Sequence, residues 1–140
     1  GSHRGWSDIK NALRELVTTV QRSYAIDTGR ISLTGHSMGG KGTFDIALAY
    51  PKLFARVAPL SGSVTVNDQN VQVLANTPLW AVVGSADTIV PPDSSQTFIA
   101  ALQTAGANAH LTVLDGAGHF DVPAAYLDRD LGLVDWLLAK

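Results

Sequence analysis

The sequence predicts an α/β domain in which helices flank a parallel sheet of four strands. The first observation is alternation, because short apolar runs that suit strands are separated by segments with helical spacing. The second is the run from Leu79 to Val83, which is almost purely apolar, as expected of a strand buried on both faces. Strands that alternate with helices are joined by right-handed crossovers, so the sheet is predicted to be parallel.

The composition is that of one ordinary globular domain. The 140 residues are 46% hydrophobic and 16% charged, with a formal net charge of −2. No basic excess suggests a nucleic-acid partner, and no apolar stretch approaches the roughly 18–20 residues of a membrane span. Cysteine is absent, which excludes disulfides and thiolate metal sites. Nothing in the sequence requires a metal or organic cofactor, and the compartment, cytoplasmic or exported, is undetermined.

The amino-terminal residues divide into a short tail and the first helix. Residues 1–3, Gly-Ser-His, are typical of a cleaved expression tag, and we expect residues 4–140 to form one domain. Ser7 is a candidate N-cap, and Asp8 is a favourable acid for the first helical turn. The apolar residues at helical spacing are Trp6, Ile9, Leu13, Leu16, Val17, Val20 and Tyr24.

The alternation of strand and helix then runs to the end of the chain. The connection at residues 64–77 is polar and short, so we expect no large lid there. Pro51 ends the second helix and Gly106 the third. The predicted elements are a strand at Arg30 to Thr34, a helix from Met38 to about Tyr50, a strand at Val57 to Leu60, a strand at Pro78 to Gly84, a helix from Pro91 to about Ala105 with Asp93 as its N-cap, a strand at Leu111 to Leu114 and a helix from Asp130 to Lys140.

The segment TGHSMGGKGTF, Thr34 to Phe44, fits two motifs. It contains G-x-S-x-G, the turn that presents a nucleophilic serine, and most of G-x-x-x-x-G-K-[ST], the loop that cradles nucleotide phosphates. The phosphate motif requires Ser or Thr where Gly42 stands. The acid that would hold its metal is also misplaced, because three residues separate Asp87 from the apolar run that ends at Val83. The sequence therefore favours the serine motif.

The geometry of a turn from strand to helix explains which residues the serine motif requires. Ser37 would be held in a strained backbone conformation, and glycines two residues before and after it would avoid collisions where strand and helix converge. The amide of Met38, at the start of the helix, would point toward a developing oxyanion.

A serine nucleophile needs a base, and the base needs an orienting acid. In a parallel α/β sheet of this kind the required order is serine, acid, histidine, each after the carboxyl end of its own strand. Asp87 follows the third predicted strand and His119 follows the fourth, so both order and placement agree.

Other acids and histidines have simpler interpretations. Asp93 is the rival for the orienting acid, but it suits a helix N-cap, and Asp115 shares a loop with His119 and suits a turn. His110 opens a strand and is interpreted as structural or superficial, and His3 belongs to the tag remnant.

Together the segments GHSMGG, GSADTIVPP and GAGHF resemble the α/β-hydrolase superfamily. The likeness is greatest to bacterial carboxylesterases of the dienelactone-hydrolase, acyl-protein-thioesterase and polyhydroxyalkanoate-depolymerase-like type, and it covers nearly everything from Trp6 to Lys140. It implies that Ser37 is the nucleophile, His119 the general base and then acid, and Asp87 the acid that orients His119. The Met38 N–H would be one oxyanion donor, and the substrate would be a small-molecule carboxylic ester.

Aromatic residues near these motifs leave alternatives open. His36 and Phe120, each next to a predicted catalytic residue, are candidates for contacting substrate, although His36 more often packs beside its strand and packing suits Phe120 equally well. Trp6, Trp80 and Trp136 are interpreted as core residues rather than a substrate platform.

The resemblance also predicts something missing. The complete fold has eight strands, and the four predicted here correspond to the fifth to the eighth. The loop that normally supplies the second oxyanion donor has no counterpart in this sequence. The strand at Arg30 to Thr34 would then be an open edge beside uncovered apolar helix faces. We expect either the carboxyl-terminal half of a longer esterase, pairing with its amino-terminal half, or a compact variant that self-associates. A non-catalytic hydrolase-like binding or assembly module is the alternative function.

Overall fold

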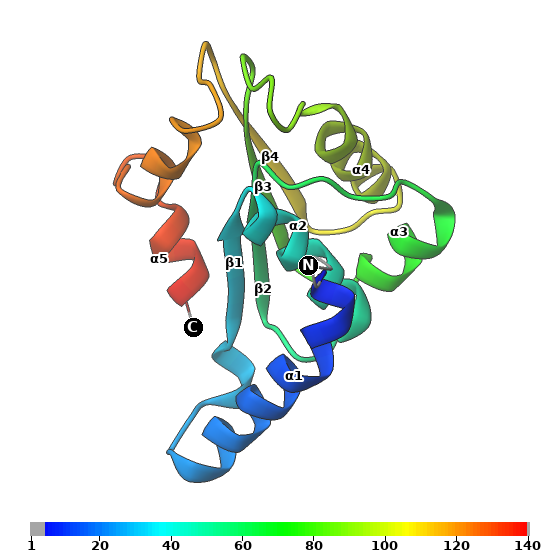
Figure 1. Ribbon diagram of the computed structural model, residues 1–140, viewed down its shortest axis with the longest axis vertical. Coiled ribbons are helices and arrows are strands. Elements are labelled where there is room, and N and C mark those ends of the chain that lie inside the picture. Colours follow the sequence, from blue (N-terminus) through cyan, green and yellow to red (C-terminus); the bar gives the residue numbers. More distant parts are fainter. Residues whose placement is uncertain (1–4, 140) are drawn as a thin grey trace.

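The computed structural model describes residues 5–139 and contains a sheet of four parallel strands (Figure 1). The predicted α/β fold class is therefore confirmed. The proposed tag remnant at residues 1–3 lies outside the described residues. The strands lie in chain order as β1 (Ser32–His36), β2 (Arg56–Leu60), β3 (Leu79–Gly84) and β4 (Ala109–Leu114).

Helices cover both faces of the sheet, with α2, α3 and α4 on one side and a short 3₁₀ helix and α5 on the other (Figure 1). The core is split in the same way, because successive side chains of a strand point to opposite faces. On β2, Val57 packs in the cluster beneath α2 and α4, whereas Ala58 and Leu60 pack in the cluster beneath α5. The helices are α1 (Trp6–Ser23), α2 (Met38–Ala49), α3 (Asp68–Leu74), α4 (Asp93–Thr104) and α5 (Leu133–Leu138), with 3₁₀ turns at Thr28–Arg30 and Val122–Tyr126.

Two predicted helix caps are wrong. Gly5, not Ser7, is the N-cap of α1, and its N–H donates to the Asp8 carboxylate at 3.1 Å, so the acid of the first turn does part of the capping. Asp93 does not cap α4 with its side chain, because Pro92 occupies the cap position with torsions that are already helical. Asp93 is instead the first helical residue.

Several segments between the motifs also differ from expectation. The predicted connection at residues 64–77 contains α3, which Asn67 caps by accepting from the Asn70 N–H at 2.7 Å. The last helix is shorter than predicted, because Gly132, with a left-handed φ of 71°, marks its start. The three tryptophans are half-buried rather than fully buried in the core.

The side of the molecule formed by α1 and the outer edge of β1, called the α1 flank below, is poorly covered. Within the described residues β1 pairs only with β2, so its other edge is open, as the sequence predicts. No residue of α1 is buried, and Leu16 on its apolar stripe is 59% exposed. Figure 1 shows α1 extending away from the sheet below α2. No helix of the described part is both long and apolar enough to cross a bilayer.

Candidate active site

Ser37 occupies a sharp turn between β1 and α2. Its φ of 60° and ψ of −117° are strained for a residue with a side chain. A Cβ on Gly35 would lie 2.6 Å from the Gly39 carbonyl oxygen, so strand and helix converge where predicted. The second steric prediction is wrong, because a Cβ on Gly39 would meet nothing within 4 Å. Gly40 is the crowded position, 2.3 Å from the Leu60 carbonyl oxygen.

The three predicted triad residues meet in one hydrogen-bonded chain. His119 Nε2 lies 2.7 Å from Ser37 Oγ, and His119 Nδ1 lies 2.8 Å from Asp87 Oδ2. Because the ionised carboxylate can only accept, Nδ1 carries the proton and donates to it, which leaves Nε2 to accept from the serine hydroxyl. His119 and Asp87 are both buried, whereas Ser37 is only partly buried.

The turn after β3 holds Asp87 in its ionised form. Asp87 Oδ1 accepts from the N–H groups of Ile89 at 3.0 Å and Val90 at 2.8 Å. Burial raises the pKa of Asp87, but hydrogen bonds from His119, Val90, Ser61 and Ile89 outweigh it, and the net effect lowers that pKa. The rival Asp93 lies at the start of α4 and makes no such contact among the described residues.

The loop after β4 presents His119 and is tied down at several points. The Gly118 N–H donates to Asp121 Oδ2 at 2.8 Å, on the amino side of the histidine. His36 Nε2 lies 2.9 Å from the His119 carbonyl oxygen, and the two rings are 4.7 Å apart. Asp115, at the far end of the loop, accepts from the Ser85 hydroxyl at 3.4 Å, which agrees with its interpretation as a turn residue.

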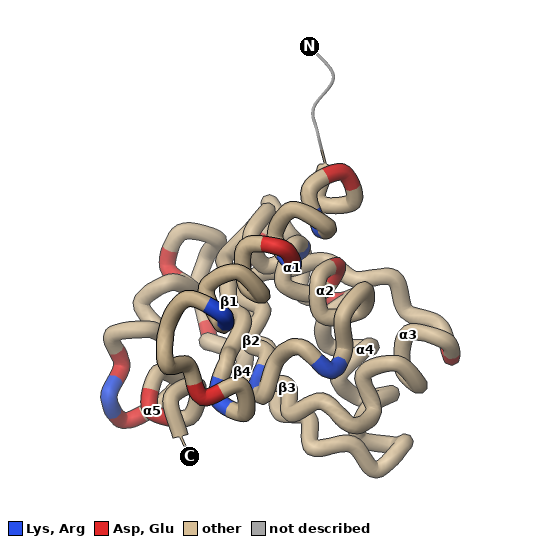
Figure 2. The backbone as a smooth tube through the Cα atoms, turned by 90° about the horizontal axis from the view of Figure 1, so that it is seen from below, with Lys and Arg blue, Asp and Glu red and all other residues tan. Residues whose placement is uncertain are grey.

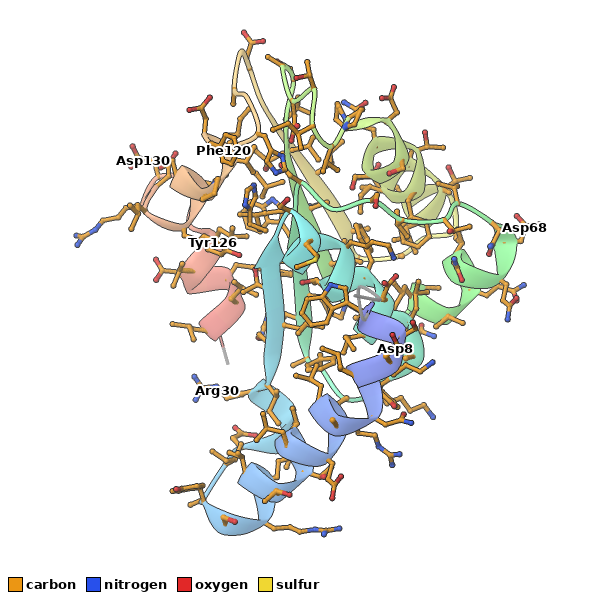
Figure 3. All side chains as sticks on the ribbon, in the orientation of Figure 1. Asp8, Arg30, Asp68, Phe120, Tyr126 and Asp130 are labelled. Atoms are coloured by element: carbon orange, nitrogen blue, oxygen red, sulfur yellow. The ribbon has the colours of Figure 1, made fainter. Side chains whose placement is uncertain are left out.

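Phe120 and His36 therefore differ as candidates for contacting substrate. Phe120 is 82% exposed, and its ring meets His119 edge-on at 5.3 Å between centroids. Figure 3 places its side chain near the upper end of β1, above Tyr126. His36 already has a partner in the His119 loop, so it packs beside its strand. The prediction that either residue contacts substrate stays a prediction.

Met38 stands at the first position of α2, where helical N–H groups have no partner within the helix. Its side chain is 74% exposed. The Trp6 indole N–H donates to the Met38 carbonyl at 2.7 Å, and the Trp6 ring lies against Gly42, where a Cβ would approach to 2.3 Å. The sequence does not predict this contact, because no local pattern links α1 to the serine turn.

The remaining polar groups around the serine turn do not form a second site. Lys41 Nζ pairs with Asp45 Oδ2 at 2.6 Å on the surface of α2, as suits a solvated residue of a first turn. Within residues 5–139 no three histidine or acidic side chains gather as metal ligands would. Acidic and basic residues are interspersed over the backbone in Figure 2, without a large region of one sign in that view.

In this parallel sheet a strained serine lies between the first strand and its helix, and aspartate and histidine lie on the loops after later strands. This arrangement defines an α/β-hydrolase fold. A solved thermostable esterase superimposes with a TM-score of 0.82 at 26% identity, over 90% of this chain and 35% of that one. The dienelactone hydrolase family matches residues 1–125. The chain belongs to that family.

Two curated proteins illustrate what this chain resembles in sequence. A Salmonella typhimurium protein provisionally named carboxymethylenebutenolidase is 29% identical over 141 aligned residues, which cover 85% of this chain and 52% of that protein. Cutinase 2 of Thermobifida cellulosilytica is 35% identical over 96 residues, 68% of this chain and 35% of the cutinase. The chain thus spans about half the length of the first of these relatives.

Proposed function

We propose that this chain carries the nucleophile, base and acid of an enzyme that hydrolyses carboxylic esters. The observation that supports it most is the continuous chain from Ser37 Oγ through the His119 ring to the Asp87 carboxylate, with links of 2.7 and 2.8 Å. Membership of the dienelactone hydrolase family and the names of the relatives agree with ester hydrolysis.

The proposed reaction has an acylation step and a deacylation step. His119 takes the proton of Ser37 as the serine oxygen attacks the ester carbonyl, and Asp87 stabilises the imidazolium that forms. The Met38 N–H donates to the oxyanion of the tetrahedral intermediate. His119 then protonates the departing alcohol, which leaves an acyl group on Ser37. A water molecule deprotonated by His119 releases the acid and restores the serine.

The second oxyanion donor is proposed to come from outside this chain's described residues. Loss of one such donor typically slows an enzyme by about 10²–10³-fold, so we expect weak or no hydrolysis of short-chain p-nitrophenyl esters by this chain alone. An amino-terminal half of the fold, in the same or a separate polypeptide, would pair with the open edge of β1 and cover the α1 flank. Its addition should restore turnover, and full activity of a pure monomer of this chain would contradict the proposal.

A fluorophosphonate probe tests the triad without requiring turnover. We expect covalent labelling at Ser37 that Ser37→Ala and His119→Ala abolish and Asp87→Asn weakens. Asp93→Asn is the matched control, and it should label like the wild type. A well-folded chain that does not label would favour the binding-module alternative, and a greater loss in Asp93→Asn than in Asp87→Asn would reassign the acid.

A further inference from the structure

Ser61 directly follows β2, and the proposed triad gives its side chain no role. Its side chain is 1% exposed, and its Oγ is the only buried side-chain nitrogen or oxygen among residues 5–139 without a hydrogen bond of good geometry. Buried hydroxyl groups nearly always have a partner, because leaving one unpaired costs free energy. A hydroxyl at this position therefore calls for an explanation.

The backbone of Ser61 makes the choice of serine more unusual. Ser61 has a φ of 44°, and it and Ser37 are the only non-glycine residues of the described chain with positive φ. Glycine would suit that torsion better, and alanine would suit the burial better. Serine carries both the strained torsion and the buried polar group. Such residues persist mainly where the site uses them.

Hydrogen bonds fix Ser61 between the two strands that carry the nucleophile and the acid. The Ser37 N–H donates to the Leu60 carbonyl at 3.0 Å, and the Ser61 N–H donates to the Val82 carbonyl at 2.9 Å. Ser61 thus lies between the serine turn and β3, the strand that leads to the Asp87 turn. Its hydroxyl is among the groups that lower the pKa of Asp87, together with His119, Val90 and Ile89, against the opposing effect of burial.

We propose that Ser61 is a positioning residue, whose hydroxyl donates to the Asp87 carboxylate and holds it in the orientation that His119 needs. The carboxylate has room for this donor, because an ionised carboxyl group offers about four lone-pair sites. Ile89, Val90 and His119 already occupy three of them. The proposal rests on the proposed function only in giving Asp87 its role in the triad.

The test removes the hydroxyl in two ways in the 140-residue chain. Ser61→Ala keeps the strain and deletes the hydroxyl, whereas Ser61→Gly deletes the hydroxyl and relieves the strain. Ser95→Ala is the matched control, since Ser95 is equally buried, at 1% exposed, and donates its hydroxyl to the Gly62 carbonyl at 2.7 Å. The readouts are the pH titration of the Asp87 carboxyl carbon by NMR and the rate of fluorophosphonate labelling.

Both Ser61 variants should raise the pKa of Asp87, because a donor to the charged form is lost. Labelling should slow by about 2- to 10-fold, which corresponds to one ordinary hydrogen bond. Ser95→Ala should leave the Asp87 titration and the labelling rate as in the wild type. If Ser61→Ala does not fold, Ser61→Gly carries the comparison alone.

Two results would overturn the proposal. One is an Asp87 titration that neither Ser61 variant moves. The other is slow labelling in Ser61→Gly but not in Ser61→Ala, because only Ser61→Gly changes the backbone strain, and the strain rather than the hydroxyl would then be responsible. Failure of the triad itself has a different signature. A folded wild type that does not label at Ser37 contradicts the proposed function, while the titration of Asp87 still decides the role of Ser61.

Discussion

The carboxyl end of β1 and its outer edge differ sharply in how they are surrounded. We call the carboxyl end of β1, together with the loops that follow β1 to β4, the site edge. There the backbones approach so closely that Gly40 has no room for a methyl group. At the outer edge no strand of the described chain pairs with β1, and the neighbouring α1 has no buried residue. One strand thus borders both a tightly packed region and an open one.

This difference indicates which parts of the fold the triad geometry requires. The links among Ser37, His119 and Asp87 are made by loops of the four strands present, and none of them involves the α1 flank. The α1 flank carries exposed apolar side chains such as Leu16 and Ile9, which is typical of a surface that another polypeptide covers. The hydrogen bonds that link Ser37, His119 and Asp87 are all made within the described chain. The α1 flank is where we expect dependence on a partner.

The largest effect is expected from Gly40→Ala at the site edge. The new Cβ would lie 2.3 Å from the Leu60 carbonyl oxygen and 2.9 Å from Gly62 Cα, and neither backbone can move freely. We expect a loss of about 3 kcal/mol in the free energy of unfolding, measured by urea titration. Gly39→Ala is the control, because nothing lies within 4 Å of its Cβ. Equal losses in the two variants would show that the site edge packs less tightly around Gly40 than its close contacts indicate.

The second largest effect is expected at acid pH, which should lower the stability that Asp87 contributes at the site edge. The pKa of Asp87 is lowered in the folded chain, so its contribution to stability is fully present above the unfolded value of about 4. That contribution is lost as the pH falls through the lowered folded value. Thermal unfolding from pH 6 downward should therefore show a decline below about pH 4 that is smaller in Asp87→Asn. A parallel decline in both proteins would mean that other carboxyl groups cause it.

The site edge was also the part that the sequence predicted best, for a physical reason. A strand buried on both faces has to be apolar, and a serine turn between strand and helix has to carry small residues, so both leave local patterns. The pattern nevertheless marked Gly39 as crowded when Gly40 is, because the choice depends on how β2 and its loop lie beside the helix. Contacts between distant segments decide such details.

Features without a local pattern escaped prediction. Ser61 gained its positive φ and its burial from strands on either side, and its own neighbours in sequence suggest only a loop. The helix α3 has only seven residues, although Asn67 followed by Asp68 is a fair helix-start signal that could have found it. Gly5 rather than Ser7 caps α1 because the Asp8 carboxylate satisfies the cap N–H.

Trp6 of α1 contacts the serine turn and so joins the two regions. The variant Trp6→Phe tests how far stability and labelling depend on this contact. The variant loses the bond of 2.7 Å to the Met38 carbonyl, which fixes the first turn of α2 beside Ser37. We expect a stability loss of about 1 kcal/mol and a labelling rate reduced by a few fold. Trp80→Phe is the control, because it loses an indole bond of 2.9 Å to Thr112 Oγ1 between β3 and β4. It should lower stability similarly and leave labelling unchanged.

The smallest effect is expected from Leu16→Lys on the α1 flank. Leu16 is 59% exposed, and a charge there should change the free energy of unfolding by no more than about 0.5 kcal/mol. Leu13→Lys is the comparison, because Leu13, three residues earlier on the same helix, packs against the core under α2. Leu13→Lys should lower the free energy of unfolding clearly more than Leu16→Lys does.

Urea unfolding together with sedimentation of the two variants separates packing within the chain from association between chains. If Leu16→Lys is silent in unfolding yet reduces self-association or the pairing with an amino-terminal half, the α1 flank is an interface. If it unfolds the chain, α1 belongs to the core and the contrast between the two regions fails.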